Sequence, residues 1–179
     1  MKKTLTISLM VFCIISISGC TSNTVITPPG GTGNGATSTE YASFYLSTGG
    51  VTTVSSAETT LVINTEETNS DSDIFYLNNN QVTVNKTTDF MIIGDCYFNT
   101  GGSSRSEYTI WLERNGEDVL GTRSGIYERG YDSGSTGTFT IITSVTSGDV
   151  FQMRIQLTDG GATTGYQDNY GTRLTFIEV

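Results

Sequence analysis

Thr138–Leu157 reads TFTIITSVTSGDVFQMRIQL and contains two extended stretches separated by a short polar turn. Most apolar residues of both stretches fall on one face, because they recur at every second position: Phe139, Ile141 and Val145 before the turn, and Phe151, Met153, Ile155 and Leu157 after it. This period of two is typical of strands that bury one face, and the Ser-Gly-Asp turn between them predicts an antiparallel hairpin. An isolated strand pair is only marginally stable, so we expect flanking strands to complete a two-layer β fold.

The composition of the whole chain also favours an all-β protein. Its 179 residues include 21 Gly and only 2 Pro, and they are rich in Thr and Ser. This composition suits many short strands and turns and argues against long helices. The formal net charge is −9. Because an acidic chain repels phosphate backbones, we expect no nucleic-acid partner.

Histidine and cysteine usage limits the chemistry that is open to the chain. There is no His, which removes the commonest general base, the Ser-His-Asp triad and every His-containing metal site. Beyond the N-terminal region the sole cysteine is Cys96, so no disulfide can form within the domain. We expect Cys96 to be a buried, unreactive thiol. The sequence therefore predicts no enzymatic activity and no catalytic residues.

The N-terminal residues have the pattern of an export signal. Lys2 and Lys3 precede Leu5–Ile17, a mostly apolar run that is shorter than the roughly 20 residues of a membrane-spanning helix. The run ends in Ile17-Ser18-Gly19-Cys20, which resembles the bacterial lipobox, whose Cys is joined to diacylglycerol before cleavage. The resemblance implies a lipoprotein signal peptide at 1–19 and a membrane anchor on acylated Cys20, since two acyl chains anchor stably.

A tether and a single domain are expected after the signal peptide. Residues 20–39 are rich in Thr, Ser, Gly, Pro and Asn without periodicity, which predicts a flexible tether. The domain then covers residues 40–179. Thr21 follows the Cys, and by analogy with lipoprotein sorting this implies outer-membrane delivery if the source has two membranes. We expect a lipid-anchored protein of the bacterial cell envelope, at the outer membrane or cell surface in that case.

About ten short extended stretches follow one another in the domain at the spacing of a sandwich or jelly roll. Asn78–Asn80 and Asn115-Gly116 mark turns, because Asn and Gly tolerate positive φ, and Thr65–Asp73 predicts a polar, acidic loop. Besides the hairpin, the predicted strands are Tyr41–Ser47, Leu61–Ile63, Ile74–Leu77, Gln81–Val84, Phe90–Phe98, Tyr108–Glu113, Val119–Tyr127 and Thr172–Val179.

Several of these stretches occur in an order and spacing similar to a known superfamily. They are Ala42–Leu46, Phe90–Phe98, Arg114-Asn115-Gly116, Ser147-Gly148-Asp149 and the closing apolar strand. Together they resemble the tumour-necrosis-factor-like and complement globular-head superfamily, particularly its bacterial and phage versions. That family usually has Gly-Tyr at the start of the central strand, where this chain has Asp89-Phe90. The resemblance implies a ten-strand, two-sheet jelly-roll sandwich that forms a homotrimer and binds partners without catalysis.

A second apolar layer agrees with a trimer. A strand that packs one face on its own core should have a polar second face, but several strands here do not. Cover by sister subunits explains this layer; cover by loops, or scattered exposed residues without a role, are the alternatives. Asp95 shares this face and could pair with an Arg across a subunit seam or face water. The predicted interface residues are Tyr41, Tyr45, Met91, Ile93, Tyr97 and Ile142.

Two Tyr-rich segments are the candidate ligand-binding loops. Each combines Tyr with carboxylate or amide groups, the mixture found where sugars stack and hydrogen-bond. Two strands separate the segments, so both are expected at one end of the sandwich. Trp111 is expected in sheet packing instead. The predicted ligand-binding residues are Tyr127, Glu128, Arg129, Tyr131, Asp132, Tyr166, Asp168, Asn169 and Tyr170.

Asp71 and Asp73 are the only metal candidates. Their carboxylates are ligands that Ca²⁺ accepts, but the spacing lacks the Gly and Glu of an EF-hand loop, and we favour a solvated acidic loop over a metal site. The sequence thus predicts a surface-anchored lipoprotein that displays a non-catalytic, trimeric, cofactor-free head for adhesion or recognition of a protein or glycan. A monomeric, calcium-dependent glycan-binding β-sandwich lipoprotein and a structural envelope component remain alternatives.

Overall fold

The computed structural model describes residues 39–48, 50–99, 105–128, 134–160 and 164–179. The predicted signal peptide, Cys20 and nearly all of the tether lie outside these residues. The described residues form strands and turns without a helix, so this part of the chain contains no helix that could cross a membrane.

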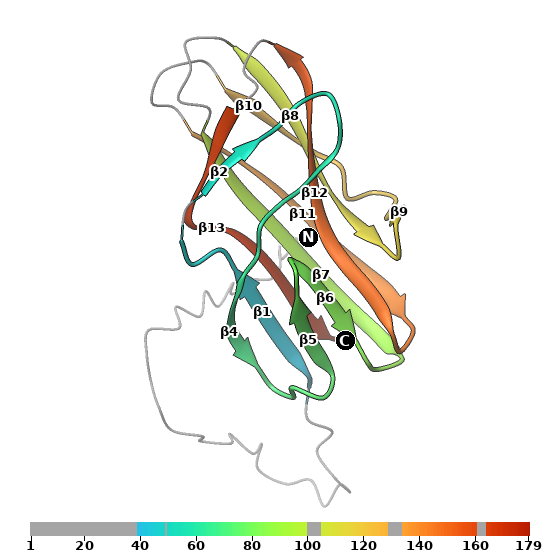
Figure 1. Ribbon diagram of the computed structural model, residues 1–179. Helices are drawn as coiled ribbons and strands as arrows, with labels where there is room; N and C mark the ends of the chain where they lie inside the picture. The colour runs from blue at the N-terminus through green and yellow to red at the C-terminus, as the bar shows by residue number, and fades with distance from the viewer. Residues whose placement is uncertain (1–38, 49, 100–104, 129–133, 161–163) are drawn as a thin grey trace, which may run out of the picture. The chain divides into compact units, whose positions relative to one another are not determined.

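The strands form two antiparallel sheets (Figure 1). In sheet A the order is β11 (Ser135–Val145), β7 (Thr88–Asn99), β13 (Thr164–Glu178), β1 (Tyr41–Tyr45) and β4 (Thr65–Asn69), with β2 (Gly50–Thr53) on β13. In sheet B it is β10 (Ser124–Glu128), β8 (Ser106–Arg114), β12 (Asp149–Gly160), β6 (Gln81–Val84) and β5 (Phe75–Asn78). β3 (Thr59–Thr60) pairs with β12, and β9 (Glu117–Asp118) pairs with β8. The predicted all-β jelly-roll sandwich is confirmed.

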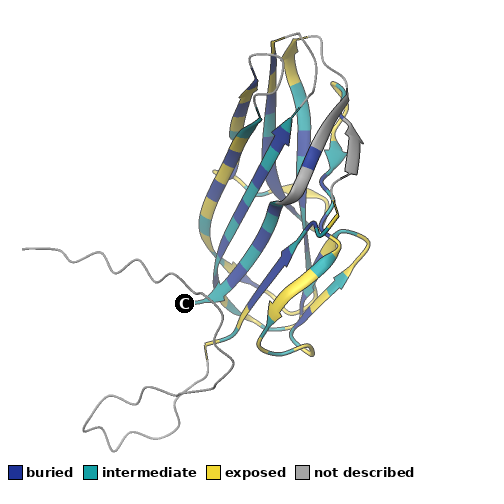
Figure 2. Cartoon of the chain, turned by 90° about the vertical axis from the view of Figure 1, so that its left-hand side faces the viewer, coloured by how far each residue is buried: buried dark blue, intermediate teal, exposed yellow. Residues whose placement is uncertain are grey.

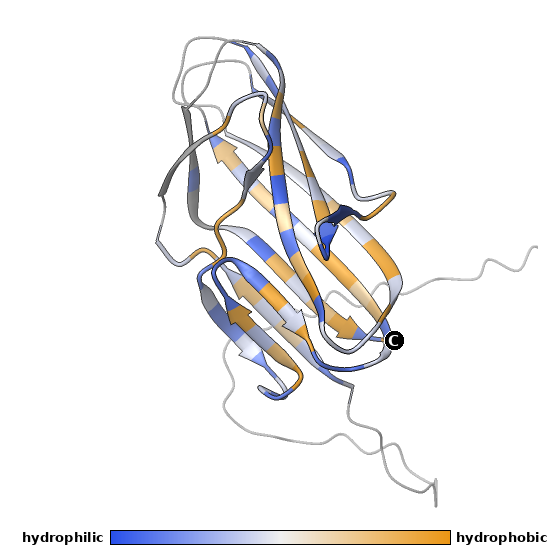
Figure 3. Ribbon diagram, turned by 45° about the vertical axis from the view of Figure 1, so that its right-hand side comes forward, coloured by the Kyte–Doolittle hydropathy of each residue, from blue (hydrophilic) through white to orange (hydrophobic). Residues whose placement is uncertain are grey.

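The core lies between the two sheets and is rich in aromatic side chains. Buried and partly exposed residues alternate along the strands, as Figure 2 shows by burial and Figure 3 by hydropathy. The core side chains all come from Ala42–Phe176, and Thr37–Val179 forms one compact unit. This segment therefore contains the hydrophobic core that the described residues form, and we expect it to fold without residues 1–36.

The central strand β7 alternates as predicted, and Gly94 makes room in it for an aromatic ring of the neighbouring strand. Phe90, Ile92 and Cys96 are fully buried, while the intervening residues are partly exposed. Gly94 lies opposite Phe139 of β11, and a Cβ at Gly94 would come within 2.2 Å of the Phe139 ring. The missing side chain therefore lets this ring pack flat against the neighbouring strand.

The predicted hairpin at Thr138–Leu157 is wrong. β11 pairs with β7 in sheet A, whereas β12 pairs with β8, β6 and β3 in sheet B, so the connection crosses between the sheets. Gly148 has φ of 94° and donates its N–H to the Val84 carbonyl at 2.8 Å. The Asp149 carboxylate accepts the Thr146 N–H at 2.9 Å. The two apolar faces therefore meet across the core instead of lying side by side.

The two Asn turns are confirmed. Asn79 and Asn80 have φ of 49° and 65° between β5 and β6. Asn115 and Gly116 have φ of 54° and 86° between β8 and β9. Both pairs lie in the left-handed region that a two-residue hairpin turn requires.

Two further predictions need correction. Leu61–Ile63 is not a strand; its Leu61 and Ile63 side chains are fully buried, but the strand is the preceding β3. The predicted loop Thr65–Asp73 begins with a strand, β4, which pairs with β1 at the edge of sheet A. An edge strand leaves much of its surface in water, and that is why its sequence is polar.

Candidate functional site

The outer face of sheet A has an apolar row that crosses four strands. Ile142 of β11 lies opposite Met91 of β7, Met91 lies opposite Ile177 of β13, and Ile177 lies opposite Tyr41 of β1. Ile142 is 64% exposed and Tyr41 is 49% exposed. We call these four residues the apolar row. Such a continuous stripe on a solvent-facing sheet is typical of a surface that another molecule covers.

The six residues predicted for a subunit interface all lie on this face. Besides three members of the apolar row, they include Tyr45, Ile93 and Tyr97. The Tyr97 ring lies against Gly134, where a Cβ would come within 1.9 Å of it. That another subunit covers these residues stays a prediction. Ile177 belongs to the row but is not among the six predicted interface residues.

Asp95 has its Arg neighbour within the same chain. Arg173 of β13 lies opposite Asp95, and Arg173 also forms an ion pair with Glu67 at 3.2 Å. Burial raises the pKa of Asp95, and the positive charge of Arg173 opposes this rise. An Arg from another subunit is therefore not needed to explain this carboxylate.

Cys96 is a free, fully buried thiol in the core. Burial raises its pKa to about 12; a hydrogen bond with Thr172 Oγ1, 3.5 Å from Sγ, opposes this rise, and the Asp95 charge adds to it. A thiol with this pKa has almost no thiolate near neutral pH, and the thiolate is the nucleophile. The expected buried position of Cys96 is confirmed.

We expect Cys96 in the folded segment Thr37–Val179 to resist alkylation by iodoacetamide in mildly alkaline buffer. In denaturant the same thiol should react completely, because burial is what suppresses the thiolate. Mass spectrometry of the alkylated and unmodified protein gives the extent of reaction. Rapid labelling of the native protein would contradict both the burial and the raised pKa.

The first Tyr-rich segment is only partly described. Tyr127 is 41% exposed on the outer face of sheet B, and Glu128 is buried at the end of β10. The Glu128 side chain lies near Tyr108: burial raises the pKa of Tyr108, a Ser106 hydrogen bond opposes this, and the Glu128 charge adds to it. Arg129, Tyr131 and Asp132 lie outside the described residues.

The second Tyr-rich segment is not a loop. Residues 166–170 belong to β13, and the side chains of Tyr166, Asp168, Asn169 and Tyr170 lie outside the described part of the chain. Gln167 is buried and its side-chain amide bonds both the N–H and the C=O of Val62, at 3.2 Å each. Its Nε2 also donates to Thr172 Oγ1 at 3.0 Å. The buried amide of Gln167 thus has hydrogen-bond partners inside the fold, although the surrounding sequence is polar.

Trp111 packs on the outer face of sheet B, as expected. It is fully buried, although it follows the outward-facing alternation of β8. The Arg123 guanidinium lies 4.4 Å from the ring centroid, and Arg154 is its cross-strand neighbour on β12. Arg154 is held by Thr60 at 2.8 Å and lies 3.5 Å from both Glu58 and Glu113. Arg123 therefore lies over the indole at the distance of a cation–π contact.

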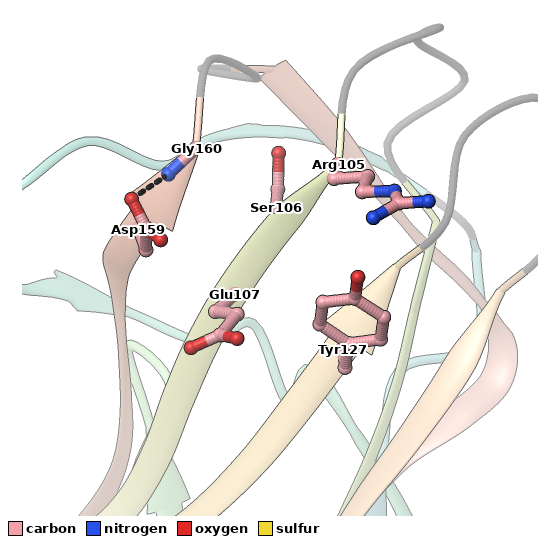
Figure 4. A pocket seen from close by; sticks show the side chains of 6 residues that line it. All are labelled: Arg105, Ser106, Glu107, Tyr127, Asp159 and Gly160. Atoms are coloured by element: carbon pink, nitrogen blue, oxygen red, sulfur yellow. Dashed lines mark hydrogen bonds between the residues drawn. The ribbon is translucent and has the colours of Figure 1, made fainter.

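A hollow of about 230 Å³ opens where β8 begins and where β10 and β12 end (Figure 4). Tyr127 and Asp159 both lie opposite Glu107 in the sheet register. Figure 4 shows Tyr127 and Arg105 on one side of the hollow, Asp159 on the other, and Glu107 between them. Of these four side chains, only that of Tyr127 is among the predicted ligand-binding residues. The hollow is lined by Arg105, Ser106, Glu107, Tyr127, Asp159 and Gly160.

Asp71 and Asp73 lie in a turn that their own hydrogen bonds explain. Asp71 Oδ1 accepts the Asp73 N–H at 2.8 Å, and the Asp71 carbonyl accepts from both Ile74 and Phe75. In the described ranges, no three acidic or Cys side chains lie close enough together to hold a metal ion. A calcium site at this turn therefore has no further support.

Comparisons with known proteins identify the fold. No family model matches the chain, and no curated protein matches its sequence. Among solved structures, murine APRIL at pH 8.5 is 13% identical with a TM-score of 0.54, over 79% of this chain and all of that one. The Eiger TNF structure from S. frugiperda is 9% identical with a TM-score of 0.54, over 79% of this chain and 92% of that one. The chain therefore has the jelly-roll fold of tumour-necrosis-factor ligands.

Proposed function

We propose that the chain is a lipid-anchored protein of the bacterial cell surface that displays a trimeric, non-catalytic binding head. The apolar row on sheet A carries the trimer, because four apolar side chains in register leave a surface that water does not favour. Three copies arranged about a three-fold axis would remove it from solvent on every copy. The TNF-like fold supports the same arrangement, since TNF-like proteins are typically trimers.

The head recognises a protein or glycan at the end of the sandwich where β8 begins and where β10 and β12 end. Strand ends and loops on a rigid sheet scaffold commonly carry recognition residues. The hollow at this end combines an exposed aromatic ring with charged groups of both signs. Since the apolar row lies on the other sheet, a trimer leaves this surface open to a ligand.

The solution mass of Thr37–Val179 tests the trimer. Light scattering should give three times the mass of one chain at micromolar concentration, with or without Ca²⁺. A single-chain mass would contradict the trimer. A mass that changes when Ca²⁺ is added would favour the calcium-dependent alternative.

We expect Cys20→Ser to release the protein from the membrane fraction of a bacterial host. The proposed anchor is a thioether on the Cys20 sulfur, and Ser cannot form it. Fractionation followed by mass spectrometry of the N-terminal peptide measures both the release and the missing acyl mass. Cys13→Ser is the matched control and should remain acylated in the membrane, because this Cys precedes the predicted cleavage site. An unmodified Cys20 in the native protein would contradict the anchor.

A further inference from the structure

We propose that the hollow between Tyr127 and Asp159 binds one neutral sugar ring of a glycan. This names the ligand class for the binding head and rests on that proposed function. The site is built from three neighbouring strands of sheet B and needs no side chain from outside the described residues.

The register of sheet B sets the width of the site. Tyr127 on β10, Glu107 on β8 and Asp159 on β12 form one cross-strand row. Neighbouring strands lie about 4.8 Å apart, so the outer two residues of the row are separated by about 10 Å. One pyranose ring with a hydrogen bond on its far side fits this distance. The volume of about 230 Å³ also suits one ring and leaves little room beyond it.

The side chains match the surface of a sugar. A pyranose has an apolar C–H face that stacks on an aromatic ring, and Tyr127 presents a ring that is 41% exposed. The sugar hydroxyls are donors, and Glu107 and Asp159 supply carboxylate acceptors. Arg105 supplies donors for hydroxyl or ring oxygens. A stacking ring with convergent polar groups is what a small polar ligand requires.

The charges of the lining favour a neutral ligand. Two carboxylates face one guanidinium across the hollow, which disfavours an anionic sugar such as a sialic acid. The same guanidinium beside the Tyr127 ring disfavours an ammonium group that would otherwise suit an aromatic ring and two carboxylates. A neutral hexose meets neither repulsion.

The Asp159 carboxylate and the backbone at Glu107 are held in place before any ligand arrives. The Asp159 Oδ1 accepts the Gly160 N–H at 2.8 Å, and Thr158 Oγ1 donates to the Glu107 carbonyl at 3.0 Å. Gly160 has φ of 101°, and a Cβ there would come within 2.2 Å of the Arg105 carbonyl oxygen. Only Gly allows β12 to end this close to β8 and to position Asp159 beside Glu107.

A second hollow of about 240 Å³ extends the site along the sheet and shares Glu107 and Tyr127 with the first. It is present because Gly125 has no side chain, and a Cβ added there would meet nothing within 4 Å. A second sugar can therefore lie beside the first. This predicts that a disaccharide binds more tightly than a monosaccharide.

NMR titration of ¹⁵N-labelled Thr37–Val179 tests the assignment with methyl glycosides of glucose, galactose, mannose and N-acetylglucosamine. We expect at least one of them to shift the amide signals of Glu107, Tyr127 and Gly160, with a Kd on the order of 1 mM. Tyr127→Ala should weaken this binding about tenfold, while Tyr127→Phe keeps the stacking ring and stays within about twofold. Thr138→Ala, on the exposed face of sheet A, is the control and should change nothing.

Gly125→Val tests the second hollow. Val suits a strand, and the open space at this position lets the variant fold. We expect it to abolish the tighter binding of the matching disaccharide and to leave the monosaccharide within about twofold. Equal disaccharide binding by wild type and Gly125→Val would overturn the two-sugar site.

Three outcomes would overturn the sugar assignment. They are no shift with any of the four glycosides, shifts that Tyr127→Ala leaves unchanged, and stronger binding of sialic acid or tetramethylammonium than of every neutral sugar. The solution mass is measured on the same samples. A three-chain mass without sugar binding overturns the sugar site alone, and a single-chain mass with sugar binding overturns the trimer alone.

Discussion

Phe176→Ala is expected to lower the free energy of unfolding by about 3–5 kcal/mol. Phe176 is fully buried on β13, and its ring centroid lies 5.5 Å from that of Phe151 and 5.8 Å from that of Phe75. Phe44 and Phe90 complete the cluster at 6.5 and 6.4 Å. Ala removes the ring between the two sheets and leaves a cavity that the surrounding strands cannot close. Both the burial and the edge-to-face ring contacts are lost.

Denaturant unfolding of Thr37–Val179 at one fixed protein concentration measures this loss. Trp111 is the only Trp in the chain, so its fluorescence reports the transition. Tyr76→Ala is the matched control, because it removes a ring that is 57% exposed at β5. We expect its effect to stay within about 0.5 kcal/mol. Similar losses for the two variants would mean that the aromatic cluster does not hold the sheets together.

Met91→Glu is expected to convert the proposed trimer into single chains. Met91 is central in the apolar row, between Ile142 and Ile177. In a covered face, three copies of Glu would each place a carboxylate in an apolar contact without a partner. Removing such a charge from water costs several kcal/mol per copy. This cost, paid three times, opposes the free energy of association of the trimer.

Light scattering separates an interface effect from a folding effect when circular dichroism shows that the variant keeps its strands. Met91→Leu keeps an apolar side chain of similar size and should retain the three-chain mass. Thr83→Glu adds the same charge to the outer face of sheet B and should also retain it. A three-chain mass for Met91→Glu would show that the apolar row does not form the interface.

The two surfaces have separate roles in this scheme. The apolar row lies on sheet A, and the sugar hollow lies at one end of sheet B. Variants of Met91 and of Tyr127 should therefore act independently, since side chains that are far apart and share no partners usually contribute additively. A trimer would also present three hollows, and several weak sugar contacts to one glycan surface bind far more tightly than one.

Local sequence determined a large part of this protein. The period of two along Phe90–Phe98 predicted which residues of β7 are buried, because a strand turns alternate side chains to opposite faces. Asn79-Asn80 and Asn115-Gly116 predicted their turns, because Asn and Gly adopt positive φ more readily than other residues, whatever surrounds them. The same local reasoning placed Met91, Tyr41 and Ile142 on one outer face. The similarity to TNF-like proteins came from the order of such stretches along the chain.

Tertiary structure alone decided which strands pair. A period of two shows that a strand buries one face, but it does not show which strand forms hydrogen bonds with its edge. The pattern therefore predicts a hairpin of β11 and β12, although the two strands lie in different sheets. The segment 166–170 reads as a loop, but Tyr166 and Gln167 pair with β2 and β7, far away in sequence, and this pairing makes the segment part of β13. Tyr127, Glu107 and Asp159 likewise meet only through the register of three strands. Backbone hydrogen bonds between distant segments form every one of these arrangements, and no local pattern encodes them.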